Sequence, residues 1–234
     1  MPAWRLSETP CTVQPFDVLG ECRDNPDLPL HLLLCNEAGV RNDVTVNVGV
    51  AIAHMGPPLG QRPSRRVHSV GHASLSDDQR SRLDAFVKER LGELTFVKQQ
   101  LAAANKRLDA QYRIHPAYTR PSRACQFWRF SCVGFVLATY QHIGIELVAS
   151  PADEKSVDAL VALYGDPRLH DPDFRQDMGL SSDRNAWPVI FPGHVLNSLR
   201  RQPIEIHGPH AVRFTPQAGD EFFPSDASAS SRLA

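Results

Sequence analysis

The sequence predicts an α+β domain with a small antiparallel sheet. Two apolar runs of strand length, 30–35 and 44–53, are rich in leucine or β-branched residues, and 65–72 alternates in part. Helical patterns begin after Ser76 and again at Cys132. A sheet with helices packed against it buries both kinds of apolar face, so these segments are expected to share one core.

The predicted strands come early in the chain. The run 30–35 is followed by a turn signal at 36–39, and the β-branched segment 44–53 predicts a buried strand. Three prolines and two glycines make 55–64 a loop. Residues 65–72 are therefore expected to pair with 44–53 as a hairpin.

The predicted helices have recognisable starts. Ser76 and Gln79 form a capping-box pattern, in which the serine side chain accepts a backbone N–H three residues on. Apolar residues then follow one helical face, and the pattern resumes after Gly92, which predicts two helices. Further helices are expected over 150–164, opened by Ser-Pro, and over 192–199, opened by proline.

One domain is predicted over residues 30–224. Residues 1–29 are rich in Pro, Asp and Cys with little periodicity, so they are expected to wrap the domain irregularly. A small hairpin is expected over 204–214, and the Ser/Ala-rich tail 225–234 is expected to fray. The 234 residues, 42% of them hydrophobic, are enough for a packed core.

Composition excludes several function classes. The formal net charge of −1 gives no electrostatic reason to expect nucleic acid or an anionic membrane as a partner. No run approaches the roughly 18–20 apolar residues of a membrane helix, and no apolar leader is present, so a cytoplasmic protein without an integral membrane segment is expected. The five cysteines are too scattered for a disulfide scaffold and include no CxxC pair, so neither a metal nor a cofactor is predicted.

The segment 130–147 carries the main functional signal. Cys132 begins an apolar run of helical length, which Gly144 closes. Backbone N–H groups and the helix dipole favour a thiolate at a first helical turn, so Cys132 is a candidate nucleophile. The competing interpretation is an inert packing cysteine, which is the role expected for Cys35 and Cys125.

This segment resembles the nucleophile helix of the NlpC-type papain-like cysteine hydrolases. Residues 131–136, Tyr140 and 144–147 match the Cys-Ser-Gly-Phe-Val stretch, the tyrosine and the Gly-Ile-leucine positions of that family, although Val133 replaces the usual serine. The resemblance implies a papain-like fold with the nucleophile helix on one face of the sheet. It also implies hydrolysis or acyl transfer through a thioester, on a peptide, a peptidoglycan fragment or a lipid ester.

Within that superfamily the chain resembles the circularly permuted group, which includes relatives of lecithin:retinol acyltransferase and places the histidine strand before the cysteine helix. Residues 46–52 resemble the group's His-Val-Gly-Ile strand, and 191–196 resemble its closing segment. Asn47 stands where histidine is expected, and an amide cannot act as a general base near neutral pH. The alternatives are the standard order, using His194, and a non-catalytic binding module on the same fold.

His68 and His72 are the candidate bases, although each also fits an ordinary surface histidine. If Asn47 faces residue 72 across the predicted hairpin, strand alternation puts both histidines on the face of Asn47. A one-residue slip in the pairing would put both on the opposite face. Cys132 would then attack an acyl carbon, and Asn47 would orient the imidazole. His54 would point away from Asn47 in a regular strand.

Overall fold

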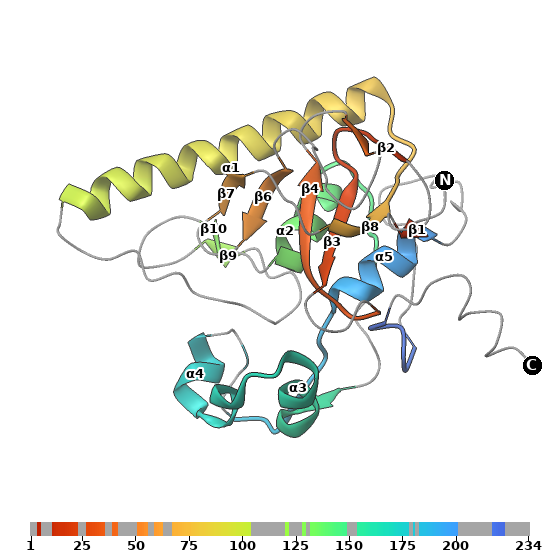
Figure 1. Ribbon diagram of the computed structural model, residues 1–234. Coiled ribbons are helices and arrows are strands. Elements are labelled where there is room, and N and C mark those ends of the chain that lie inside the picture. Colours follow the sequence, from red (N-terminus) through yellow and green to blue (C-terminus); the bar gives the residue numbers. More distant parts are fainter. Residues whose placement is uncertain are drawn as a thin grey trace, which may run out of the picture.

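The computed structural model describes residues 4–5, 11–22, 27–35, 39–41, 51–55, 59–62, 67–103, 120–121, 128–129, 132–148, 154–177, 180, 183–200 and 217–222. Within these ranges helices and strands are mixed, and the strands of the main sheet are antiparallel (Figure 1). The predicted α+β class with a small antiparallel sheet is therefore confirmed at that level of detail.

A six-stranded sheet forms the centre of the structure, in the order β1-β8-β3-β4-β6-β7. Three two-stranded pairs accompany it: β2 with β5, β9 with β10, and β11 with β12. The sheet strands are β1 (Trp4–Arg5), β3 (Val18–Cys22), β4 (Pro29–Cys35), β6 (Ala51–Met55), β7 (Leu59–Arg62) and β8 (Val67–Gly71). The paired strands are β2 (Cys11–Val13), β5 (Gly39–Arg41), β9 (Arg120–Pro121), β10 (Trp128–Arg129), β11 (Lys155–Ser156) and β12 (Ala186–Trp187).

The strand pairing corrects two sequence predictions. The expected hairpin between 44–53 and 65–72 is wrong, because β6 pairs with β4 and β7, whereas β8 lies between β1 and β3. The irregular wrap expected over 1–29 is also wrong where β3 forms, since Val18 and Leu19 are fully buried in the sheet. A five-residue strand interrupted by a glycine gives too little periodicity to detect. The expected loop 55–64 likewise contains β7.

The helices are α1 (Asp77–Ala103), α2 (Cys132–His142), α3 (Val157–Tyr164), α4 (Pro172–Asp177) and α5 (Pro192–Arg200), with a 3₁₀ turn η1 (Pro167–His170). The capping box before α1 is confirmed, because the Ser76 N–H donates to Gln79 Oε1 (2.9 Å) and the Gln79 N–H donates to Ser76 Oγ (3.2 Å). The predicted break at Gly92 is wrong, since α1 continues through it. One interior glycine costs only about 1 kcal/mol, which a long helix can absorb.

The helix expected over 150–164 begins later than predicted. Ser156 is its N-cap and accepts the Ala159 N–H, and Gly165 ends it at φ 68°, a conformation that glycine adopts readily. The segment that follows α3 contains η1 and α4. These short elements surround a small separate core of Leu160, Leu169, Leu180, Trp187, Val189 and Phe191.

The main core lies between the sheet and α2, with α1 and α5 completing it (Figure 1). Two glycines let α5 approach the sheet closely. A Cβ on Gly20 would lie 2.8 Å from Leu196 Cδ1, and one on Gly71 would lie 2.6 Å from Leu199 Cδ1. The expected hairpin at 204–214 and the tail 225–234 lie outside the described residues.

Candidate functional site

Cys132 is the first residue of α2, as the apolar run predicted. Its side chain is partly buried against the main core. Backbone groups of Leu32, Val133 and Cys132 itself form hydrogen bonds with the thiol that favour its ionised form. The sulfur therefore lies between the start of a helix and the centre of strand β4, on the sheet face that α2 covers.

The pairing of β6 leaves room for the contact between Leu32 and the Cys132 sulfur. Strand β4 pairs with β6 at Leu34 and Cys35 in the part of the chain that the structure describes. The register of β6 then shifts between Ile52 and His54, which marks a bulge. Leu32 lies beyond the last of these pairs, next to the point where α2 begins.

The electrostatics of Cys132 differ from the expectation at a helix start. Burial raises the pKa of the thiol from its ordinary 9.0 to about 11, and the Glu21 carboxylate adds to this effect. The three backbone hydrogen bonds lower the pKa but do not compensate for the loss of water. At pH 7 the thiolate fraction is on the order of 10⁻⁴, so the resting side chain is a neutral thiol.

His72 follows β8 directly and forms a buried pair with Asp17. The distance from His72 Nδ1 to Asp17 Oδ2 is 2.8 Å, and the same carboxylate oxygen accepts the Gln14 N–H at 2.7 Å. A carboxylate that orients an imidazole in this way is common in general-base catalysis. No pattern in the sequence indicates Asp17, because only the pairing of Val18 with Gly71 brings it near His72.

The structure separates Cys132 from His72 along β3. Leu32, which contacts the sulfur, pairs with Gly20 at the centre of β3, whereas Asp17 directly precedes this strand, three residues before Gly20. That separation is about 10 Å along the strand. Strand β8 also lies across β3 from β4, which adds a lateral separation. The described contacts of the sulfur therefore do not include the His72 imidazole.

The other two candidates give less information. His68 lies where the pairing of β8 with β3 shifts register, between Ser69 and Val67. Asn47 lies outside the described residues. His68 and His72 could share a face with Asn47 across a hairpin only if their strands were neighbours, and β8 is not adjacent to β6.

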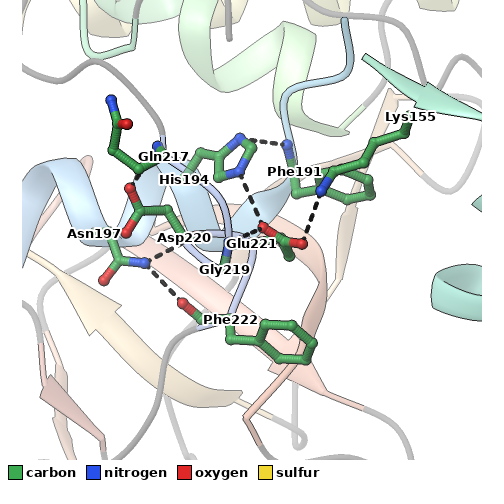
Figure 2. Close-up of polar contacts among 9 residues, drawn as sticks. All are labelled: Lys155, Phe191, His194, Asn197, Gln217, Gly219, Asp220, Glu221 and Phe222. Atoms are coloured by element: carbon green, nitrogen blue, oxygen red, sulfur yellow. Dashed lines mark hydrogen bonds and ion pairs between the residues drawn. The ribbon is translucent and has the colours of Figure 1, made fainter. Parts of the chain in front are cut away.

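His194, the base of the standard-order alternative, lies in the first turn of α5 (Figure 2). Its Nδ1 accepts the Phe191 N–H at 3.2 Å, and its Nε2 lies 3.9 Å from Glu221 Oε2. Burial lowers the pKa of His194 to about 4, so the ring is neutral at pH 7. Leu196, in the middle of α5, packs over Gly20, the central residue of β3 that pairs with Leu32.

Comparisons with known protein families, curated proteins and solved structures found no match. Across the described ranges, no helix is long and apolar enough to cross a bilayer, and no three His, Cys, Asp or Glu side chains gather as metal ligands. Any functional assignment therefore depends on the geometry of the chain's own residues.

Proposed function

We propose that this chain is a thiol-dependent hydrolase or acyltransferase with a papain-like fold, in which Cys132 attacks the carbonyl carbon of an amide or ester. The observation that carries the proposal is the position of the thiol. It begins a helix that packs on one face of an antiparallel sheet, and it receives backbone hydrogen bonds from Leu32 and Val133. Such donors also stabilise the oxyanion that forms when a thiol attacks a carbonyl group.

The neutral resting thiol determines how the reaction must proceed. A base has to take the thiol proton while the S–C bond forms, and the same proton then goes to the leaving amine or alcohol. Water, or a second acceptor, next takes the acyl group from the thioester and regenerates the thiol. Peptides, peptidoglycan fragments and lipid esters all offer the required carbonyl group, and a cytoplasmic location disfavours intact cell wall.

Two described imidazoles are candidates for the base, and each meets one requirement. His72 has an orienting carboxylate in Asp17 but lies next to the start of β3, about 10 Å along the strand from the pair of Gly20 with Leu32. His194 lies on α5, which packs over Gly20, the partner of Leu32, but its two ring nitrogens face the Phe191 N–H and Glu221. The proposal therefore assigns the nucleophile to Cys132 and leaves His68, His72 and Asn47 as predictions.

A non-catalytic binding module on the same fold is the second candidate. The raised pKa of Cys132 favours it, because a thiol that stays protonated is a poor nucleophile. In this case Cys132 is a packing residue at the start of α2, and the fold binds a peptide or lipid ester without cleaving it.

Acetyl transfer from p-nitrophenyl acetate to the full chain at pH 7.5 separates the two functions. With a pKa near 11, the thiolate population is about 100-fold below that of an ordinary thiol, and the greater nucleophilicity of a high-pKa thiolate recovers about tenfold. An inert Cys132 should therefore react about ten times more slowly than free cysteine. The enzyme should acetylate Cys132 faster than free cysteine reacts and then release acetate.

The controls are Cys132→Ser, which should abolish acetylation at this position, and Cys35→Ala, which removes the fully buried cysteine of β4 and should leave the rate unchanged. Peptide mapping by mass spectrometry identifies the acetylated residue. Acetylation of Cys132 that is slower than that of free cysteine would refute the enzyme and support the binding module.

A further inference from the structure

The turn at residues 217–222 is fastened to the rest of the molecule through Glu221 (Figure 2). Its Oε1 lies 3.0 Å from Lys155 Nζ on β11. Its Oε2 accepts the Gly219 N–H at 3.0 Å and lies 3.9 Å from Nε2 of His194 on α5. The Glu221 and His194 side chains are 9% and 3% exposed, so these charges interact with little screening by water.

Two further contacts show that the turn fits closely on α5. Nδ2 of Asn197 donates to the carbonyl oxygens of Asp220 (2.9 Å) and Phe222 (2.7 Å). At Gly193 there is room for no side chain, because a Cβ would lie 1.9 Å from the Glu221 carbonyl oxygen. The contact therefore depends on specific residues of both partners.

The charges of Glu221, His194 and Lys155 compensate one another at neutral pH but not in acid. Burial acts to raise the pKa of Glu221, but backbone hydrogen bonds and the Lys155 ammonium outweigh it, and the pKa lies below its usual range. Burial lowers the pKa of His194 to about 4, against the opposing effects of Glu221 and Asp220. In more acidic solution the carboxylate becomes neutral while His194 becomes a second cation beside Lys155. A protonated, buried His194 beside the partly buried Lys155, with Glu221 no longer charged, strongly disfavours the arrangement in which the turn is bound to α5.

We propose that residues 217–222 form an acid-released strap, which detaches from α5 and β11 on acidification while the main sheet and α2 stay folded. The groups that face His194 are Glu221 and Asp220 on the strap and Lys155 on β11. Release would expose the first turn of α5 and the Lys155 ammonium to solvent. The inference stands independently of any reaction at Cys132.

Hydrogen exchange of the full chain, followed by mass spectrometry between pH 7 and pH 3.5 and corrected for intrinsic exchange rates, tests the strap. The amides of 217–222 should lose at least tenfold in protection between pH 5 and pH 3.5, while those of α2 keep theirs. Loss of protection by both segments together would show global unfolding and overturn the proposal, as would an unchanged strap.

Two variants test which groups control the release. His194→Asn keeps an acceptor for the Phe191 N–H but cannot take a proton, so the strap should open at a lower pH. Glu221→Gln removes the charge that holds Lys155, so the strap should be loosened already at pH 7. Asp166→Asn, at the exposed pair with Arg168, is the matched control and should change nothing. If both cluster variants give the profile of the unmodified chain, the proposal is wrong.

Discussion

Mild acid should destabilise the folded protein through His194. The imidazole has a pKa of about 4 in the folded chain and the ordinary 6.5 when exposed by unfolding. Between these values the unfolded chain holds a proton that the folded chain does not, so the free energy of unfolding falls as the pH falls from about 6.5 to about 4. Above pH 6.5 the neutral His194 causes no loss of stability, and below about pH 4 the loss is complete.

The size of the effect follows from the two pKa values. The difference between 6.5 and about 4 corresponds to about 3 kcal/mol over the whole range. About 2 kcal/mol of this is lost between pH 7 and pH 5, before the strap is expected to open. Such a change moves the urea midpoint of a domain by roughly 1 M.

The assay is urea unfolding at pH 7, 6 and 5, followed by circular dichroism. The unmodified chain should lose about 2 kcal/mol over this interval, and His194→Asn should lose much less. His170→Asn is the matched control, because the His170 side chain is 57% exposed and its removal should leave the pH dependence intact. An equal loss of stability in the unmodified chain and in His194→Asn would refute the reasoning.

Two further substitutions test the packing of the main core by urea unfolding. Gly71→Ala should cost about 1–3 kcal/mol, because the new Cβ would meet Leu199 at Cδ1 (2.6 Å) and at Cβ (3.0 Å). Gly20→Ala should cost less, because its new Cβ would meet Leu196 Cδ1 at 2.8 Å but its next neighbour, Ser69 Cβ, only at 3.4 Å; the reverse order would contradict this packing. Tyr140→Phe should cost about 1–3 kcal/mol, because the Tyr140 hydroxyl donates a buried hydrogen bond to the Phe16 carbonyl at 2.8 Å; a loss under 0.5 kcal/mol would show that this carbonyl finds another donor.

Local signals in the sequence predicted those elements whose start or apolar run is marked by neighbouring residues. The capping box at Ser76, the apolar run at Cys132 and the proline at 192 each mark a helix that the structure contains. The leucine-rich run 30–35 likewise corresponds to β4. In each case the deciding interactions lie within a few residues of one another, so a single sequence carries the information.

The strand order could not be predicted in the same way. Pairing of β8 with β3 depends on how side chains from distant segments fill one core, including the contacts of α5 with Gly20 and Gly71. A strand pattern shows that a segment has a buried face but does not identify its neighbour. The proposed hairpin was the simplest pairing of neighbouring segments, and it failed because β7 takes that place.

The candidate site was predictable only in part, for a related reason. The position of Cys132 at the start of a helix is local, and it is confirmed. Its raised pKa depends on burial against the core and on Glu21, which lies far away in the sequence. The Asp17–His72 pair likewise exists only because two strands meet. Chemistry that depends on tertiary neighbours has no signature in the residues around one side chain.

The strand order also determines when each part of the sheet can assemble as the chain leaves the ribosome. The hairpin of β3 and β4 is local and can form early, but β8 has to reach β3 after four other strands have been made. Strand β1 pairs with β8, so Trp4 gains its neighbour only after Val70 has been synthesised. A nascent or truncated chain that stops before β8 leaves one edge of β3 open, and an open edge of this kind invites association with other chains.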